Sequence, residues 1–382
     1  MADRRSVPRP MPAALSLPTA RRAVVIGAGS FGTAVAVLLA RGGFRTTLQT
    51  RTADQAERLA ADRTNEVYLP GVELPPQLRI EAADAGVQRA DYVFLGVPSK
   101  HIQAVIATLL ERGLGRRTAV VSLAKGLVPP HGVAPTILLR EAFGASRTAC
   151  IGGPAHAREM VHEGAGLVAA STSEELAGAL AQVFQRAGVV CEASNDPVGV
   201  ELVGAAKNAA ALAAGATEAQ GLNAAGAAAG HIFAEVWRFA EGQGAQPESL
   251  IGLAGTGDLV ATALAPMSRN RRAGELLGQG VPTAEIPARI GQAVEALESV
   301  PLLARALHRA EVDAPVTSGL TRLISGELPL DEWVALVRTT VPPSPVRWRG
   351  RRPPKGFWQR QWARVKALFR RERPALDVPP GS

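Results

Sequence analysis

One glycine-rich segment near the start of the chain constrains its fold more than any other, namely Gly27-Ala28-Gly29-Ser30-Phe31-Gly32. It follows an apolar run at residues 23–26, which is typical of a buried strand. It precedes residues 33–41, which we expect to form a helix that ends at Gly42-Gly43. A strand, a glycine turn and a helix in this order predict the start of a βαβ unit.

Each glycine of this segment has a physical role in such a unit. Gly27 permits a tight turn, Gly29 lets the backbone approach a pyrophosphate, and Gly32 lets the helix pack closely on the strand. The N-terminus of the helix would face the negative charge. We therefore predict a dinucleotide site lined by Gly27, Gly29, Ser30, Phe31 and Gly32. The alternative is a glycine-rich turn that binds nothing.

The rest of the chain separates into two parts with different sequence patterns. Further short apolar runs at 44–50, 92–95, 118–121 and 148–151 predict strands, and helical stretches separate several of them. This alternation indicates an α/β fold, a Rossmann-type doubly wound parallel sheet covered on both faces. From Val198 to about Ala310 the patterns are helical, with no convincing strand. We therefore expect a dinucleotide-binding domain at 21–195, followed by an all-α substrate domain at 196–335.

The net charge of +8 belongs to the ends of the chain. Residues 341–382 carry +9 and residues 1–20 carry +2, so the remaining body is mildly acidic at −3. The basic pI therefore gives no reason to expect nucleic-acid binding by the folded body. We interpret residues 1–20 as a disordered lead-in, because they lack the apolar core of an export signal.

Composition excludes some other classes of protein. The two cysteines, Cys150 and Cys191, have no metal-binding or disulfide-framework spacing, and no cluster of His, Cys and Asp suggests a metal site. No apolar run approaches the roughly 18 residues that a membrane span needs. We therefore expect a cytoplasmic protein without a metal.

The end of the second expected strand bears on the choice of cofactor. An NAD-preferring site usually has an acidic residue there, but this strand ends Leu48-Gln49-Thr50-Arg51. Arg51 could form charge-assisted bonds to the 2′-phosphate of NADP, which favours NADPH slightly over NADH. The alternative is an exposed charge at the end of a strand.

Lys207 lies in an otherwise apolar helical stretch, Gly204-Ala-Ala-Lys-Asn-Ala-Ala-Ala. Burial would lower its pKa toward a range useful for proton transfer. An ammonium beside a ketone oxygen could supply the proton that must accompany a hydride. Alternatively, the side chain could extend to solvent.

An ordered set of motifs over about residues 22–330 resembles the NAD(P)-dependent glycerol-3-phosphate dehydrogenases of the bacterial type. Besides the glycine segment, the set comprises Tyr68-Leu69-Pro70-Gly71-Val72, Gly96-Val97-Pro98-Ser99, Ala124-Lys125-Gly126, Gly153-Pro154, Val200-Glu201-Leu202, Ala206-Lys207-Asn208, Gly255-Thr256-Gly257-Asp258-Leu259, Ser268-Arg269-Asn270-Arg271-Arg272 and Leu277-Gly278-Gln279-Gly280. The resemblance implies hydride transfer between NAD(P)H and dihydroxyacetone phosphate, giving sn-glycerol 3-phosphate for phospholipid synthesis.

The resemblance also implies roles for individual residues. It makes Lys207 the catalytic proton donor and acceptor, and Lys125 a contact of both substrate and cofactor, after a strand expected at 120–124. Asp258 would lie near Lys207 and orient it; alternatively, it caps a helix. The implied substrate site comprises Lys125, Gly153, Lys207, Asp258, Ser268, Arg269 and Asn270, and the cofactor site gains Ala157, Arg269 and Glu295. For Ser268 to Asn270 the alternative is a capped helix with a basic surface.

This chain departs from the family pattern at several positions. Ala155 stands where the family usually has Ser or Thr, and Glu218-Ala219-Gln220-Gly221 stands where it tends to have Asp-Gly. His231 replaces a second basic residue, and Ala296-Leu297 replaces Gly and an aromatic residue. Two alternative functions stay open: a hydroxyacid or ketoacid reductase on the same fold, and a nucleotide-binding protein without catalysis.

The tail, residues 336–382, contains a basic amphipathic segment at 357–371. At 100° per residue its apolar face would carry Trp358, Trp362, Val365, Leu368 and Phe369, opposite a face of Arg and Lys. Such helices lie in anionic membrane interfaces. We expect peripheral membrane contact; the alternatives are loose polyanion binding and packing on another protein. A homodimer is the assembly that we consider for the folded body.

Overall fold

The computed structural model describes residues 21–83, 86–265, 268–292 and 294–341. The expected lead-in at 1–20 and the expected amphipathic helix at 357–371 therefore lie outside the described residues. The chain separates into two units, Met1–Thr340 and Val341–Ser382, and the description below concerns the first.

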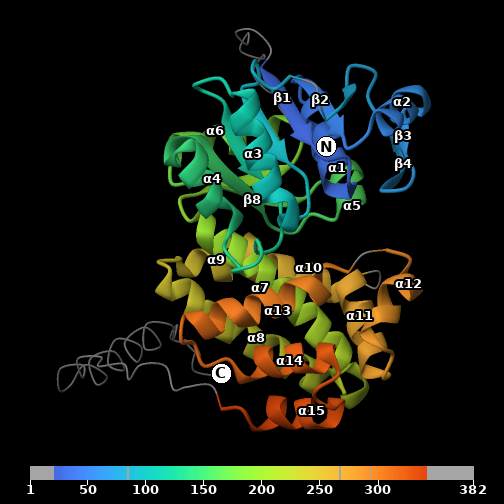
Figure 1. Ribbon diagram of the computed structural model, residues 1–382, viewed down its shortest axis with the longest axis vertical. Coiled ribbons are helices and arrows are strands. Elements are labelled where there is room, and N and C mark those ends of the chain that lie inside the picture. Colours follow the sequence, from blue (N-terminus) through green and yellow to red (C-terminus); the bar gives the residue numbers. More distant parts are fainter. Residues whose placement is uncertain (1–20, 84–85, 266–267, 293, 342–382) are drawn as a thin grey trace, which may run out of the picture. The chain divides into compact units, whose positions relative to one another are not determined.

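Eight strands in the described part of the chain form one sheet in the order β10-β9-β8-β7-β6-β1-β2-β5 (Figure 1). Their bounds are β1 Arg22–Ile26, β2 Arg45–Thr50, β5 Arg79–Ala82, β6 Tyr92–Leu95, β7 Ala119–Ser122, β8 Thr148–Gly152, β9 Gly166–Ala170 and β10 Val190–Ser194. A separate hairpin pairs β3 (Thr64–Asn65) with β4 (Leu69–Glu73). The predicted Rossmann-type sheet is confirmed.

One edge of the sheet differs from the parallel arrangement that we predicted. The neighbouring strands β5, β2, β1, β6, β7 and β8 are all parallel. In contrast, β9 pairs antiparallel with β8, and β10 runs parallel to β9. The connection from β8 to β9 contains only the six-residue helix α5, Ala157–His162. This connection, residues 153–165, has enough residues for a parallel crossover, but α5 rises only about 9 Å. It therefore does not return the chain along the roughly 16 Å length of β8, and β9 runs back beside β8 in the opposite direction.

Both faces of the sheet are buried because each central strand alternates its apolar side chains between two cores. Val25, Phe94 and Val121 pack in one core with α1 (Ser30–Arg41) and α6 (Glu174–Arg186). Val93 and Val120 pack in the other with α3 (Ile102–Arg112) and α4 (Pro135–Phe143). One further helix, α2 (Ala53–Asp62), follows β2.

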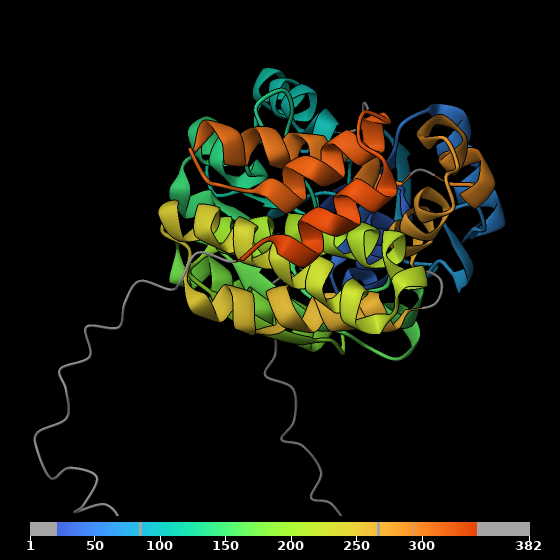
Figure 2. The same cartoon turned by 90° about the horizontal axis from the view of Figure 1, so that it is seen from below.

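The second half of the described chain is helical, and Figure 2 views it from below. Its helices are α7 Pro197–Ala216, α8 Leu222–Gly242, α9 Pro247–Ile251, α10 Asp258–Leu264, α11 Arg269–Gly278, α12 Ile286–Ile290, α13 Glu295–Arg309, α14 Pro315–Ser325 and α15 Leu330–Thr339. Helix α7 is buried along nearly its whole length. Its Ala-rich sequence makes this possible, because small side chains let helices pack around it on all sides.

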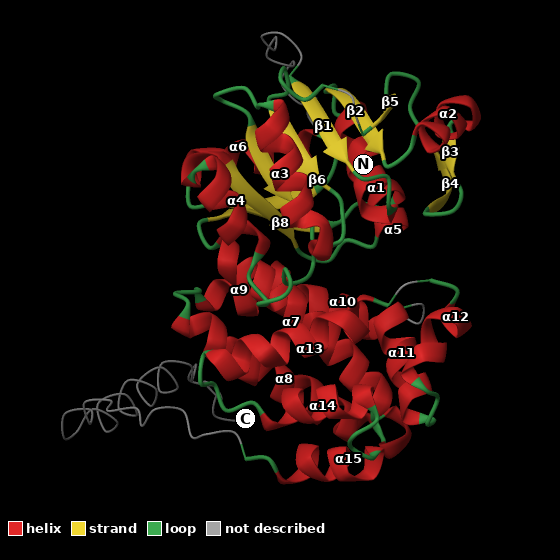
Figure 3. Ribbon diagram, in the orientation of Figure 1, coloured by secondary structure: helices red, strands yellow, loops and turns green. Residues whose placement is uncertain are grey.

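The junction between the two halves is fixed by one buried carboxylate. Asp196 caps α7 by accepting the Gly199 N–H at 2.8 Å. Its other oxygen accepts the Gln246 N–H at 2.8 Å and the Ser249 hydroxyl at 2.7 Å. The start of α7 is thereby tied to α9, and all the strands of the described residues precede α7 in the chain (Figure 3).

No helix among the described residues combines the length and the apolar character needed to cross a membrane.

Candidate active site

The glycine turn between β1 and α1 forms one side of the candidate site. Gly27 has a φ of +108°, and a Cβ there would lie 2.6 Å from the Gly96 carbonyl oxygen. A Cβ on Gly32 would lie 2.1 Å from the Gly27 carbonyl oxygen. These two glycines are therefore required by backbone packing. A Cβ on Gly29 would meet nothing within 4 Å.

The open space at Gly29 lies at the N-terminus of α1, where Gly29 is the N-cap and Ser30 and Phe31 are the first helical residues. Exposed N–H groups and the helix dipole make this position suited to a pyrophosphate. The turn is held from outside by buried Asn65, whose amide donates to the Ala28 carbonyl oxygen at 3.0 Å and to Thr33 Oγ1 at 2.8 Å. The residues present thus fit a dinucleotide.

Lys125 lies beyond the C-terminal end of β7. The strand that we expected to run to Ala124 ends at Ser122, so Lys125 belongs to the following loop. Its Nζ lies 5.4 Å from the centre of the Phe31 ring, within cation–π range, and donates to the Gly153 carbonyl oxygen at 3.1 Å. Residues that follow the carboxyl ends of β1, β7 and β8 therefore meet around the Lys125 ammonium.

Asp258 joins this ammonium to the helical half of the chain. One carboxylate oxygen accepts from Lys125 Nζ at 3.2 Å, and the other accepts from Lys207 Nζ at 2.7 Å. The alternative that Asp258 caps a helix is wrong: Asp258 is the first residue of α10, Gly257 is the N-cap, and no side chain caps this end. Its position follows a π-helical turn, Leu253–Gly257 (η4), rather than an open loop.

The charges at this site change the pKa of both partners. Burial and, to a smaller extent, the nearby Lys125 charge lower the pKa of Lys207 to about 8, against the opposing effect of Asp258. Burial alone would raise the pKa of Asp258, but the Lys125 and Lys207 ammoniums hold it below its usual value. The alternative that Lys207 extends to solvent is wrong, because only 6% of the residue is exposed.

A chain of amide groups ties α11 and α13 to the lysines. Buried Asn208 donates to the Lys125 carbonyl oxygen at 3.1 Å and accepts from Asn270 at 2.9 Å. Asn270 Oδ1 in turn accepts the Ala296 N–H at 3.2 Å. The start of α11 therefore lies beside Lys207, its neighbour Asn208 and the first turn of α13.

Two glycines allow α11 to approach α7 this closely. A Cβ on Gly274 would lie 2.0 Å from the Leu212 carbonyl oxygen, and a Cβ on Gly215 would lie 2.1 Å from the Arg271 carbonyl oxygen. The two helices thus cross backbone against backbone. We call this pair of contacts the glycine crossing, and it sets the distance between the start of α11 and Lys207.

The remaining predicted residues lie at the ends of helices or strands. Ser268 caps α11 by accepting the Arg271 N–H at 3.4 Å, so the capping alternative holds for this residue. Arg269 is exposed at the first position of α11, and Ala157 is the first residue of α5. Glu295 begins α13, close enough for its charge to act on Lys207. Arg51 is exposed just beyond β2, and its backbone N–H donates to Gln55 Oε1 at 3.4 Å, outside the cluster of Lys125, Lys207 and Asp258.

The sequence did not single out three residues that the structure brings to this site. Asn208 follows Lys207 directly in a motif that we had noted, whereas Asn65 carried no signal. Thr262 lies one helical turn after Asp258, and its buried Oγ1 has no hydrogen-bond partner among the described residues. Residues four apart share a helix face, so this hydroxyl is available on the same side as the Asp258 carboxylate.

The arrangement is suited to proton transfer near an anion. Two ammoniums share one carboxylate, so the cluster has a net charge of +1 when both lysines are protonated. Lys207 has a pKa near 8, so close to neutral pH its ammonium can donate a proton and its neutral amine can accept one. Within the described ranges, no group of three His, Cys, Asp or Glu side chains could hold a metal ion.

Two family models match the chain. The model described as NAD-dependent glycerol-3-phosphate dehydrogenase N-terminus matches residues 22–177, and the corresponding C-terminus model matches residues 196–335. The residues that we had selected as site residues lie within these two matches, with the junction at Asp196 at the start of the second.

Individual relatives agree with these matches. A glycerol-3-phosphate dehydrogenase (NAD(P)+) of Methylococcus capsulatus is 37% identical over 317 residues, which cover 81% of this chain and 94% of the relative. One from Pseudomonas syringae pv. tomato is 33% identical over 310 residues, covering 80% of this chain and 90% of the relative. The crystal structure of glycerol-3-phosphate dehydrogenase from Coxiella burnetii has a TM-score of 0.79 at 29% identity and covers 85% of this chain and 100% of its own.

More distant structures share the fold alone. A ketopantoate reductase from Ralstonia eutropha has a TM-score of 0.55 at 20% identity, covering 82% of this chain and 99% of its own.

Proposed function

Since the chain belongs to the NAD-dependent glycerol-3-phosphate dehydrogenase family, we infer that it is an NAD(P)-dependent oxidoreductase. It transfers a hydride between NAD(P)H and dihydroxyacetone phosphate, giving sn-glycerol 3-phosphate. The reaction adds a hydride to carbon 2 of the triose phosphate and a proton to the oxygen on that carbon. The reduced nicotinamide supplies the hydride when it is bound, and the residues of this chain supply the proton and the positive charge.

Lys207 is the proton donor of the proposed mechanism. Its ammonium gives a proton to the ketone oxygen in reduction, and its neutral amine takes the proton back in oxidation. Asp258 holds the ammonium at 2.7 Å and so fixes the direction in which it points. Lys125 adds a second positive charge beside the substrate, where negative charge develops on the oxygen.

The substrate phosphate is assigned to the start of α11. Arg269 offers a charged donor there, and Ser268 and Asn270 flank it at a helix N-terminus, which favours a dianion. The unpartnered Thr262 hydroxyl and the Gly153 backbone complete the substrate site. For the cofactor, the open space at Gly29 supports a pyrophosphate over Gly27–Gly32, with Arg51, Ala157 and Glu295 as further contacts.

The single observation that carries this function is the Lys207–Asp258–Lys125 cluster. Lys207→Ala should fold and bind reduced cofactor as the wild type does, while its turnover of dihydroxyacetone phosphate falls by about 10²–10⁴. The matched control is Lys100→Ala, which removes a half-exposed lysine paired with Glu298 at the surface. Near-normal kcat in folded Lys207→Ala would remove this lysine from the mechanism.

The same assay tests the alternative functions. A ketoacid reductase on this fold would turn over 2-dehydropantoate faster than dihydroxyacetone phosphate, and a protein without catalysis would turn over neither. We expect turnover of dihydroxyacetone phosphate alone. Cofactor oxidation that depends on a ketoacid instead would overturn the proposed substrate.

We further propose that the enzyme works in the cytoplasm and docks on anionic membranes through its basic tail. The support is the sequence of residues 357–371, which alternates aromatic and cationic residues with helical periodicity. The homodimer stays a prediction, to be measured by light scattering of the full chain.

A further inference from the structure

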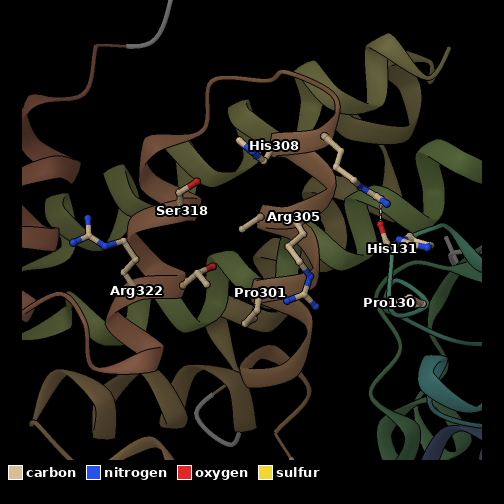
Figure 4. A pocket seen from close by; sticks show the side chains of 10 residues that line it. Pro130, His131, Pro301, Arg305, His308, Ser318 and Arg322 are labelled. Carbon is tan, nitrogen blue, oxygen red and sulfur yellow. Dashed lines mark hydrogen bonds between the residues drawn. The ribbon is translucent and has the colours of Figure 1, made fainter.

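A groove lies between α13 and α14, away from the residues of the candidate active site. It has a volume of about 440 Å³, a size ordinary for small-molecule sites. Pro301, Arg305 and His308 come from one helix, Ser318 and Arg322 from the next, and Pro130 and His131 from a loop (Figure 4). Ala304, Arg309 and Thr321 complete the lining.

The groove is lined by basic side chains and by no acidic one. Three arginines and two histidines line it, and none of its ten lining residues is acidic. The Arg309 guanidinium donates to the His131 carbonyl oxygen. Within the described part of the chain, the Arg305 and Arg322 side chains make neither a hydrogen bond nor an ion pair. Two guanidiniums are therefore available to an anion from solution.

The floor between these cations is mostly carbon. It is formed by Pro130, Pro301 and Ala304, together with the aliphatic parts of the arginine side chains. Apart from the histidines, the only neutral polar side chains of the lining are the hydroxyls of Ser318 and Thr321. A hydrophilic anion would leave the apolar floor exposed to water. A nucleobase would find few hydrogen-bond partners for its polar edges.

The wall that carries Pro130 and His131 is fixed against α13. A Cβ on Gly132 would lie 2.7 Å from the Leu302 carbonyl oxygen, so the backbones are in direct contact. The adjacent Val128 and Val133 pair with each other, and Leu127 is fully buried in the core of the helical half. The groove is therefore a preformed feature of the fold.

We propose that this groove binds a single-chain anionic amphiphile, with the alkyl chain on the carbon floor and the headgroup at the rim, where Arg305 and Arg322 supply guanidiniums. Arginine pairs with phosphate and carboxylate groups through two parallel N–H donors, which suits either headgroup. The inference does not rest on the proposed function, because the groove shares no residue with the candidate active site.

The test is isothermal titration of the full-length protein with octyl phosphate, kept below its micelle concentration. Wild type should bind it at least tenfold more tightly than inorganic phosphate or octanol, because each of these lacks one half of the ligand. The double variant Arg305→Gln, Arg322→Gln should lose at least tenfold in affinity. Both side chains are exposed, so its melting temperature should equal that of the wild type.

The matched control is Arg289→Gln, which removes an exposed arginine of α12 paired with Glu285 and should leave octyl phosphate binding unchanged. Any binding by the basic tail is common to all three proteins, so the difference between them reports the groove. Equal affinity in wild type and the double variant would overturn the proposal. So would inorganic phosphate or ATP binding at the groove as tightly as octyl phosphate.

Discussion

In the proposed mechanism the proton transfer depends on Lys207, and the environment of this lysine makes its role testable by pH. Burial lowers its pKa to about 8, below the usual value of a lysine. Reduction needs the protonated form, so kcat for dihydroxyacetone phosphate should fall above pH 8, about tenfold per unit. Oxidation of glycerol 3-phosphate needs the neutral form, so its kcat should rise up to about pH 8. Initial rates measured in both directions from pH 6 to 10 check this.

The opposite sign of the two profiles is the decisive feature. As a control, Lys100→Arg changes a surface lysine and should leave both pH–rate profiles unchanged. If kcat changed with pH in the same direction for reduction and for oxidation, another group would be the one that transfers the proton.

Arg51 should determine the choice of nucleotide. The wild type is expected to prefer NADPH in kcat/KM, because an exposed guanidinium just beyond β2 can bind a 2′-phosphate. Arg51→Asp should reverse the preference toward NADH. Arg45→Asp provides a control, since Arg45 is exposed at the opposite end of the same strand. A wild type that prefers NADH and an Arg51→Asp variant that behaves like it would contradict the assignment.

At the scale of elements, the glycine crossing between α7 and α11 positions the proposed phosphate site. Gly274→Ala places a Cβ 2.0 Å from the Leu212 carbonyl oxygen, so α11 must move away from α7. We expect a loss of about 1–3 kcal/mol in the free energy of unfolding. KM for dihydroxyacetone phosphate should rise at least tenfold, with a smaller change in kcat, because Lys207 stays on α7.

The matched control for the glycine crossing is Gly226→Ala on α8. A Cβ there meets nothing within 4 Å, so alanine should stabilise the helix by up to about 1 kcal/mol and leave KM unchanged. If Gly274→Ala does not fold, Gly278→Ala is a milder substitution, since its Cβ would lie 2.7 Å from the Ala216 carbonyl oxygen. Kinetics equal to the wild type in folded α11 variants would show that the crossing does not set the phosphate site.

The elements that could be predicted from the sequence are those whose signals are local. The glycine turn was predicted from spacing, because each glycine meets a constraint within its own βαβ unit. The direction of β9 and β10 could not be predicted, because it depends on how short the helix α5 between β8 and β9 is. The strands β9 and β10 were not identified either, since short apolar runs also occur in buried helices.

The same distinction holds for the candidate site. The sequence indicated Lys207 by its apolar surroundings, and the resemblance added Lys125 and Asp258, but nothing local placed these side chains in contact. Asn65 reaches the glycine turn across 37 residues, from Asn65 Nδ2 to the Ala28 carbonyl oxygen. Contacts of this kind depend on tertiary packing, which composition and periodicity do not report.

At the scale of the whole molecule, the basic tail should decide where the enzyme is found. In liposome sedimentation with anionic lipid, the full-length chain should pellet and a chain ending at Thr340 should not. Part of the binding should persist at high salt, because aromatic side chains contribute independently of charge. Neutral liposomes are the control. Binding that is wholly abolished by moderate salt would leave only a loose attraction between polyanions and the tail.

The Lys125–Asp258–Lys207 cluster also bears on how stable the empty enzyme can be. Two cations pressed onto one buried carboxylate repel each other, and this frustration is built into the resting protein. In the proposed mechanism, a bound anionic substrate relieves this repulsion, so part of its binding free energy comes from repulsion that exists before binding. A chain selected only for stability would lose one of these lysines. Their joint presence means that the folded state gives up some stability in order to keep an excess of positive charge at this site.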